Sequence, residues 1–481
     1  MATAANQAGV FGGMNPTAYN ASDPLILFII QLVLILVVCR ALHYPLSYLR
    51  QPRVIAEVIG GIVLGPSVMG HVPNFNATIF PTASMPIVTL VANLGLVFFL
   101  FLVGLELDLA MAWKNLQISG SVAALGMAIP FALGVGVSRG LYNQFHTEEA
   151  TQQISFGLYA LFVGVAMAIT AFPVLARILT ELKLLSTHVG TVVMSAGVLN
   201  DLIGWILLAL TVALVNASSG IVVLYIFLVS CAWILVLFFL AKPGLRYVAR
   251  KTGSFENGPT QFMMLTIFML TVASAFLTDI IGVHPIFGGF LVGLVVPREH
   301  DFPKKVTEKM EDLVTLIFLP LYFALSGLKT NLGLLDNGVT WGYTIAIIVI
   351  ALVSKVIGAT AAARINKLLW RESFAVGVLM SCKGLVELIV LNVGLNAGIL
   401  SERVFTMFVV MALVCTFVTT PVTKLVYPEW YQRKLALWRK GEISWDEMNT
   451  RSGTRAATEE GEEAEGEGVQ VAEERKDEAA V

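Results

Sequence analysis

The chain has 481 residues, of which 57% are hydrophobic and only 13% are charged, and its mean hydropathy is +0.79. Soluble domains carry about a quarter charged residues, so this composition excludes a soluble globular protein and indicates a chain that crosses a membrane many times. The net charge is −2, and the basic residues are scattered over short loops, which excludes a nucleic-acid-binding patch. The sequence therefore predicts the lipid bilayer as a partner and no nucleic acid.

Thirteen apolar runs follow one another along the chain, and most have the roughly 20 residues that a helix needs to span the hydrocarbon. The ninth run is short, and the odd number of runs places the two termini on opposite sides of the membrane. The sequence thus predicts an all-α polytopic membrane protein with 13 transmembrane helices. The runs lie at about 24–42, 54–70, 86–109, 119–140, 154–179, 188–215, 220–241, 260–281, 284–297, 311–328, 340–363, 373–395 and 403–427.

The distribution of Lys and Arg sets the predicted orientation. If the N-terminal tail (residues 1–23) is extracellular or lumenal, the outer loops hold only three basic residues and the inner loops hold seventeen, which follows the positive-inside rule. The three N-x-S/T sequons also fall on the outer side, where glycosylation acts, and their asparagines are Asn20, Asn76 and Asn216. The C-terminus is then cytosolic.

The chain also repeats itself, with three short motifs of the first half recurring in the same order in the second half. Spans one to six (24–215) therefore match spans eight to thirteen (260–427), and residues 216–259 form a connecting seventh span and loop. Because the offset of seven spans is odd, the halves enter the membrane in opposite senses, an inverted-topology repeat typical of secondary transporters. The paired motifs are Ile59–Gly65 with Phe287–Gly293, Phe98–Leu105 with Leu321–Leu328, and Val163–Met167 with Val376–Met380.

The composition changes after about Val426, and residues 442–481 are rich in Glu, Gly and Ala. Such a segment cannot bury a hydrophobic core, so we predict that residues 428–481 form an acidic, disordered cytosolic tail. The alternative is a tail that regulates the protein or binds a partner.

A single carboxylate, Asp201, lies near the middle of the sixth run. A charge at that depth costs roughly 2.5–3.5 kcal/mol even on lenient insertion scales, and intramembrane carboxylates are functional as a rule. Gly197 and Gly204 lie on the same helical face, which leaves room for a backbone or a small ion. We therefore predict Asp201 as the ion-binding and proton-coupling group, with Ser195 as a further candidate; a capped structural aspartate is the alternative.

Two helices are predicted to break at the same depth. Pro173, after Phe172, removes a backbone donor in the fifth run, and superposition of the repeats places Thr170 against Lys383, which precedes Gly384 in the twelfth run. Two broken helices that cross at the midplane would aim their dipoles at each other, so Lys383 would offset the negative ends and Thr170 would offer a hydroxyl. A simple proline kink is the alternative.

Two further charges are predicted to balance this region. Lys355 lies well inside the eleventh run with small residues on its face, and we expect it to pair with Asp201; snorkelling to a surface is the alternative. Glu387 lies one helical turn beyond Lys383, which predicts a salt bridge between them.

Four segments together resemble the monovalent cation:proton antiporter-2 family, in particular its fungal and plant potassium/proton and cation/proton exchangers. The resemblance covers essentially the whole membrane part. It implies that Asp201 is the carrier carboxylate that also binds the alkali cation, that Asn200 is its companion and that Lys355 faces them. The segments are Gln51–Ser67, Phe98–Asp108, Ala171–Pro173 and the pair Asn200-Asp201.

The same resemblance implies a sodium/proton-antiporter-like fold and a homodimer, in which a core of spans four to six and eleven to thirteen moves against a scaffold. Electrogenic relatives carry two adjacent aspartates where this chain has Asn200-Asp201, so the resemblance implies electroneutral exchange. Fungal and plant relatives carry a large soluble domain after the membrane part. Here only the acidic tail follows, so either family-style cytosolic regulation is not expected or this sequence is truncated before such a domain.

These observations predict a secondary active transporter that exchanges K⁺, or alternatively Na⁺, for H⁺ by alternating access, in the service of pH homeostasis. The rivals are a sodium-coupled symporter of an organic anion, an ion channel and a receptor. An enzyme is not expected, because the sequence shows no nucleophile–base pair or metal-ligand cluster, and no cofactor is predicted beyond the transported ions. No retention signal ends the chain, so the plasma membrane and endomembranes (Golgi, endosome, vacuole) are both open.

Overall fold

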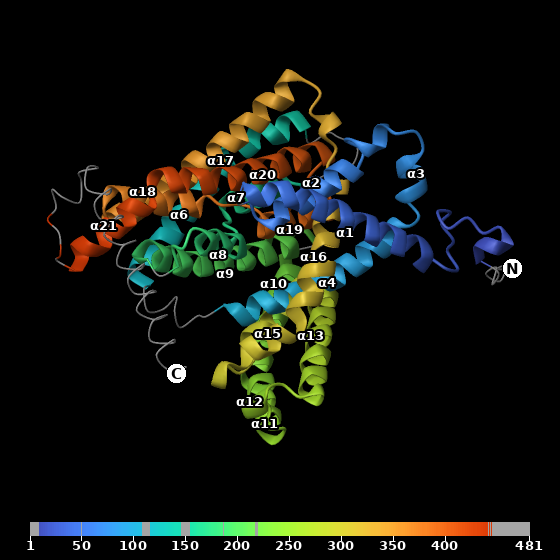
Figure 1. Ribbon diagram of the computed structural model, residues 1–481, viewed down its shortest axis with the longest axis horizontal. Coiled ribbons are helices and arrows are strands. Elements are labelled where there is room, and N and C mark those ends of the chain that lie inside the picture. Colours follow the sequence, from blue (N-terminus) through green and yellow to red (C-terminus); the bar gives the residue numbers. More distant parts are fainter. Residues whose placement is uncertain are drawn as a thin grey trace, which may run out of the picture. The chain divides into compact units, whose positions relative to one another are not determined.

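A computed structural model of the protein describes residues 9–49, 51–107, 116–145, 154–185, 187–216 and 220–440, together with residues 442 and 444 (Figure 1). The chain forms two units, Met1–Thr420 and Pro421–Val481. Within the described ranges every regular element is a helix. Residues 108–115, which include the last residue of the Phe98–Asp108 motif, lie outside them.

The helices follow the apolar runs closely. Their bounds are α1 Leu25–Tyr48, α2 Arg53–Leu64, α3 Phe75–Ile79, α4 Met85–Glu106, α6 Leu116–Phe145, α7 Phe156–Ala168, α8 Phe172–Glu181, α9 His188–Asn216, α10 Gly220–Val236, α11 Lys242–Lys251, α12 Ser254–Asn257, α13 Gln261–Ile281, α14 Pro285–Val295, α15 Phe302–Leu313, α16 Leu319–Leu328, α17 Gly338–Ile365, α18 Trp370–Met380, α19 Leu385–Asn396, α20 Glu402–Val426 and α21 Glu429–Lys440.

In the described part of the chain, 11 helices are long and apolar enough to cross a membrane, counting helices that continue through a short break as one. Two of the thirteen apolar runs fall short of that length. The ninth run forms only α14, with 11 residues, and the twelfth run is divided between α18 and α19. The protein is thus an all-helical polytopic membrane protein, and the count of 13 spans stays a prediction.

Helix α1 is largely apolar on its exposed face as well as on its buried face. One face buries residues at four-residue spacing, namely Leu27, Gln31, Ile35 and Cys39. The opposite face has the same spacing and is also apolar, although its residues are 49–59% exposed: Leu25, Ile29, Val33 and Val37. A helix that is apolar all round belongs in lipid, where the exposed face contacts acyl chains instead of water.

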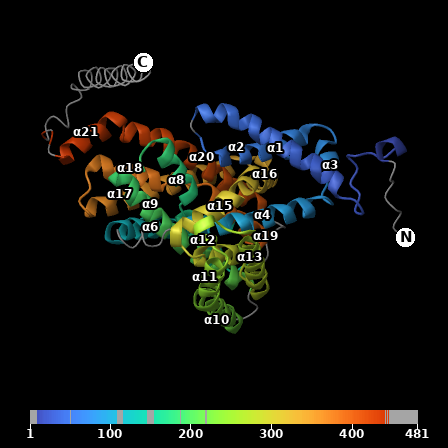
Figure 2. The same ribbon diagram turned by 60° about the horizontal axis from the view of Figure 1, so that its bottom comes forward.

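The helices of the first unit pack in two groups. In one group α6 packs against α7, α9 and α17, and α17 packs against α18; in the other, α2 packs against α1 and α16, and α4 against α14. In both views α6, α9, α17 and α18 lie on the left, and α1, α2 and α16 lie on the right (Figures 1 and 2). Helix α19 contacts members of both groups, because it packs against α7, α8 and α16.

Two close helix crossings hold the second group together, and both use the repeated glycine motifs. Where α2 crosses α16, a Cβ on Gly327 would lie 2.7 Å from the Cα of Gly61. Where α14 crosses α4, a Cβ on Gly293 would lie 2.8 Å from the Cα of Gly104. Real Cβ atoms do not approach other heavy atoms this closely, so only glycine permits these backbone contacts, as in membrane helix pairs generally.

Two boundaries predicted from the sequence were wrong. The tail was predicted as disordered from residue 428, but residues 429–440 form α21, because Tyr431 and Leu435 give that stretch a buried helical face. The loop after the seventh span was predicted to begin near residue 242, but the helix continues through a π-helical turn, Leu237–Ala241, into α11. The acidic residues 445–481 lie outside the described residues.

We expect Gly61→Ala to destabilise the folded protein, because its Cβ would overlap the carbonyl oxygen of Ala324 and force α2 and α16 apart. Overpacking of this kind costs about 1–3 kcal/mol. The measurement is the melting temperature in detergent, followed by size-exclusion chromatography. Gly136→Ala in α6 is the matched control, since open space surrounds Gly136. Equal melting temperatures for the two variants would contradict the close crossing.

Candidate functional site

The site begins with two interrupted helices that cross. Helix α7 ends at Ala168 and α8 begins at Phe172, with Pro173 in its first turn. Helix α18 ends at Met380 and α19 follows Gly384, whose φ of 143° lies in the region that favours glycine. The predicted breaks at Phe172, Pro173 and Gly384 are therefore present.

A backbone hydrogen bond joins the two breaks, because the Ala171 amide donates to the Cys382 carbonyl oxygen at 3.2 Å. The broken segments are therefore in direct contact. This is the crossing that the sequence repeat predicted, and it leaves four half-helix ends close together inside the protein.

Lys383 stabilises the C-terminal end of α7. Its Nζ donates to the carbonyl oxygens of Ala166 at 2.8 Å and Met167 at 3.0 Å, which carry the negative end of that helix dipole. The same Nζ lies 2.9 Å from Glu387 Oε2, so the predicted ion pair is present, and both side chains are fully buried. The Thr416 hydroxyl in turn donates to the Lys383 carbonyl at 2.5 Å.

Thr170 lies in the break of the other helix and connects three elements. Its hydroxyl donates to the Met380 carbonyl at the end of α18, at 2.9 Å. The same oxygen accepts hydrogen bonds from Lys355 Nζ at 2.6 Å and from Asn200 Nδ2 at 3.1 Å. A hydroxyl has one donor and two acceptor positions, so Thr170 uses its full capacity. Asn200 also accepts a hydrogen bond from the Thr170 amide, at 3.3 Å.

Asp201 is completely buried and faces the N-terminal end of α8. Its Oδ1 accepts a hydrogen bond from the Phe172 amide at 3.4 Å, where the positive end of the helix dipole favours a negative group. Its Oδ2 is buried as well and has no hydrogen-bond partner among the described residues. Buried polar atoms normally have a partner, so this oxygen is a candidate ligand for a proton or a cation. Glu387 Oε1 also lacks a hydrogen-bond partner among the described residues, but its carboxylate is ion-paired with Lys383.

The expected ion pair between Lys355 and Asp201 was wrong. No ion pair within 4.0 Å joins these two residues, which both lie in the described part of the chain. Lys355 is fully buried and its Nζ donates to Thr170 instead. Helix α7 ends at Ala168, and the extended backbone that follows brings the Thr170 hydroxyl within hydrogen-bonding distance of Lys355 Nζ. The ammonium group therefore donates to this hydroxyl.

Ser195 is the one predicted ion-binding residue that does not join the cluster. It is buried on α9, but its hydroxyl has no hydrogen-bond partner among the described residues. It lies six positions before Asp201, which corresponds to about 9 Å along a helix. Small and polar residues recur along α9, so their spacing did not show that Ser195 and Asp201 lie on different faces of the helix.

The three sequon asparagines lie in different settings. Asn20 is exposed and its Oδ1 accepts a hydrogen bond from the Ser22 amide at 2.9 Å. Asn76 lies on the short helix α3 and is half-buried. Asn216 is the last residue of α9, and its side chain lies outside the described part of the structure.

Sequence analysis missed two kinds of group in this cluster. The carbonyl oxygens of Ala166, Met167 and Met380 carry no side-chain signal, and only the ends of the helices expose them. Thr416 was missed because it is an ordinary residue of an apolar helix, and nothing in its spacing indicates that it reaches Lys383.

Comparison with known proteins identifies the relationship. The family described as "Sodium/hydrogen exchanger, transmembrane" matches residues 33–427. The chain belongs to this family. The resemblance drawn from the sequence motifs is thereby confirmed, and the matched region contains every residue of the crossed-helix cluster.

Several curated members of the sodium/hydrogen exchanger family are similar to this chain. The K(+)/H(+) antiporter 1 of Saccharomyces cerevisiae is 48% identical over 427 residues, which cover 88% of this chain and 49% of that protein. The cation/H(+) antiporter 17 of Arabidopsis thaliana is 43% identical over 424 residues, covering 88% and 50%. The chain thus spans about half the length of these relatives. The Na(+)/H(+) antiporter NhaS4 of Synechocystis is 34% identical, covering 85% of this chain and 98% of that protein.

The fold agrees with the family. A solved structure of the sodium proton antiporter MjNhaP1 from Methanocaldococcus jannaschii superposes with a TM-score of 0.56 and covers 86% of this chain and 99% of the other. The sequence identity is only 15%, so this comparison concerns the fold alone.

We expect Thr170→Val to unfold at a lower temperature than the wild type. The substitution keeps the shape of the side chain but leaves Met380, Lys355 and Asn200 without the bonds that Thr170 provides. Each buried group left unsatisfied costs about 1–3 kcal/mol. Thr170→Ser is the matched control, because it keeps the hydroxyl. Melting temperatures that fall equally for Val and Ser would contradict the importance of the hydroxyl.

Proposed function

We propose that the protein exchanges a monovalent cation for H⁺ by alternating access, with the two ions competing at Asp201. K⁺ is the favoured cation and Na⁺ the alternative. The observation that carries this proposal is the buried Asp201 carboxylate on α9, which faces the start of α8 and has one oxygen without a partner among the described residues. Asn200 and Lys355 both donate hydrogen bonds to the Thr170 hydroxyl, which in turn donates to the Met380 carbonyl.

Competition follows from electrostatics. A bare carboxylate in a medium of low dielectric constant is strongly disfavoured, so Asp201 must bind a proton or a dehydrated cation before it moves. Both ions need the same oxygen, so one excludes the other. Each cation that passes in one direction is then matched by a proton in the other. With a single such carboxylate, the exchange is electroneutral.

The finer architecture is part of the proposal. Two inverted repeats of six spans, thirteen spans in all, are supported by the glycine crossings. The Ile59–Gly65 motif of the first half contacts Gly327 of the second half, and the corresponding Phe287–Gly293 motif contacts Gly104 of the first half. The group of helices around α6 and α17 would be the moving core, and the group around α2 and α16 the scaffold of a homodimer. The N-terminus would be extracellular or lumenal and the C-terminus cytosolic.

The choice of cation is supported by the relatives. The similar yeast protein is named a K(+)/H(+) antiporter, which favours K⁺, and the similar Synechocystis protein is named a Na(+)/H(+) antiporter, which keeps Na⁺ as the alternative. The plasma membrane and the endomembranes are both compatible with this function. We also propose that the acidic tail regulates exchange; residues 445–481 lie outside the described residues.

We expect Asp201→Asn to reduce cation/proton exchange to the rate of protein-free liposomes, because the amide neither takes up a proton nor neutralises a cation. The measurement is recovery of a pH-gradient dye in proteoliposomes when K⁺, Na⁺ or Li⁺ is added. Asp279→Asn is the matched control, since Asp279 is an exposed acid near the end of α13 and should exchange at the wild-type rate. Wild-type rates for Asp201→Asn would refute the scheme.

We expect exchange to move no net charge. On a solid-supported membrane, the wild type should give no more transient current than Asp201→Asn, although it exchanges ions in the dye assay. A current that follows the pH gradient would show electrogenic exchange, and a current far above carrier turnover would favour a channel. Cation uptake that requires an added organic anion would favour the symporter.

A further inference from the structure

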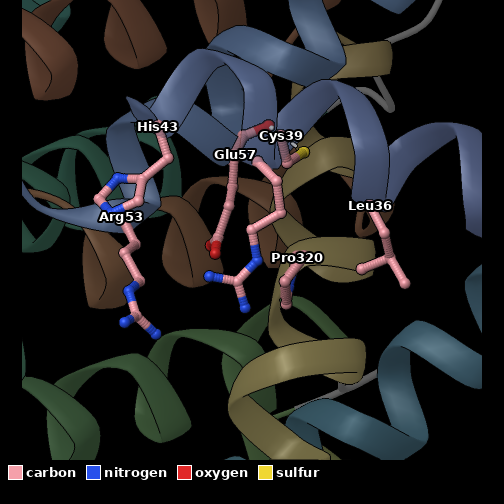
Figure 3. A pocket seen from close by; sticks show the side chains of 7 residues that line it. Leu36, Cys39, His43, Arg53, Glu57 and Pro320 are labelled. Carbon is pink, nitrogen blue, oxygen red and sulfur yellow. Dashed lines mark hydrogen bonds between the residues drawn. The ribbon is translucent and has the colours of Figure 1, made fainter. Parts of the chain in front are cut away.

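A group of basic side chains surrounds two adjoining cavities where α1, α2 and α8 meet, and the exchange mechanism uses none of them. We call this the basic cavity. Its smaller part is lined by Arg40, His43, Arg53 and Glu57, among others (Figure 3). Its larger part has a volume of about 230 Å³ and is lined by His43, Ser47, Gln51, Arg177 and Glu181.

The charges of the basic cavity do not balance. Glu181 is already paired with Arg177 at 3.0 Å. Glu57 is only 7% exposed, and its carboxylate has no hydrogen bond or ion pair with a described residue. Three arginines therefore face two carboxylates, which leaves one positive charge. The N-terminus of α2, which begins at Arg53, adds the positive end of a helix dipole.

Several buried polar atoms of the basic cavity also lack partners. Arg53 Nε and His43 Nδ1 are buried and form no hydrogen bond with a described residue. The Nε–H of arginine is a donor that almost always has an acceptor when it is buried. The larger part of the cavity has several times the roughly 30 Å³ that a water molecule occupies, so it has room for a group of several heavy atoms.

We propose that the basic cavity binds a phosphate group, carried by an anionic phospholipid headgroup or by a soluble phosphate compound. A phosphate supplies the acceptor oxygens and the negative charge that the cavity lacks, and guanidinium groups bind it with paired hydrogen bonds. Arg53 and Arg177 are the principal ligands, and His43 lies between the two parts of the cavity. The site lies on the side that the distribution of Lys and Arg assigns to the cytosol, where basic pockets between helices bind anionic headgroups.

Such a ligand would connect the two helix groups. Arg177 belongs to α8, beside the crossed helices, whereas His43 and Arg53 belong to α1 and α2. A phosphate held by both would tie them together and slow exchange. This consequence rests on the proposed function; binding of the phosphate group does not.

The test uses the purified full chain, stripped of lipid in detergent. Native mass spectrometry measures retention of phosphatidylglycerol against phosphatidylcholine, and a melting-temperature titration measures binding of inorganic phosphate. We expect the wild type to prefer phosphatidylglycerol, and Arg53→Gln or Arg177→Gln to weaken binding roughly tenfold or more, because each removes charged hydrogen bonds. Arg250→Gln is the matched control, since that side chain is 65% exposed and pairs with Glu299 at 3.6 Å, away from the basic cavity.

The outcomes distinguish a soluble phosphate compound from a lipid headgroup. A shift with inorganic phosphate indicates a soluble ligand, and retention of phosphatidylglycerol without that shift indicates a headgroup. If the wild type shows neither, or if Arg250→Gln weakens binding as much as Arg53→Gln, the proposal is wrong. If the glutamine variants do not fold, Arg53→Lys and Arg177→Lys keep the charge and should bind severalfold more weakly. Asp201→Asn should bind as the wild type does, so loss of exchange and loss of binding are measured separately.

Discussion

A helix that stops halfway across a membrane leaves backbone groups that lipid cannot satisfy, and the whole site depends on how this chain meets that constraint. Lys383 binds the open carbonyls at the end of α7, and Thr170 binds the open carbonyl at the end of α18. The amide at the start of α8 donates to Asp201. Each broken helix is thus completed by residues from another element, so neither break is stable without the other.

These hydrogen bonds also distinguish the polar groups that stabilise the broken helices from the carboxylate that is the candidate ion ligand. Thr170 has no free hydrogen-bonding position, and Lys355 Nζ is one of the donors that hold its hydroxyl in place. Asp201 Oδ2 has no hydrogen-bond partner among the described residues, and neither has Glu387 Oε1, but the Glu387 carboxylate is already neutralised by its ion pair with Lys383. A buried carboxylate without a partner is energetically costly, and in the proposed exchange this cost is what favours binding of a proton or a cation. The polar cluster is best understood as a rigid frame around one variable position.

The glycine crossings explain how this frame is held in the bilayer. Without a hydrophobic driving force between helices in lipid, close backbone contact supplies the packing energy, and the α2–α16 and α4–α14 pairs both rely on it. The region that contains these pairs and the cluster matches 98% of the Synechocystis relative but only about half of the yeast and Arabidopsis relatives. The membrane architecture is therefore what this chain shares with all of them.

The sequence by itself determined the membrane class, the apolar runs, both helix breaks and the central carboxylate, because each depends on local composition or on a repeat. Hydrophobic length predicts helices, proline and glycine interrupt them, and a charge in an apolar run has few explanations. The Lys383–Glu387 pair was also predictable, since four residues along a helix place two side chains on one face. Only the tertiary structure decided that Lys355 binds Thr170 and not Asp201, that Ser195 stays apart, and that main-chain carbonyls and Thr416 complete the cluster. Those contacts join residues more than 30 positions apart or involve the backbone. The spacing of residues along one broken helix does not determine which group of the other broken helix a side chain will contact.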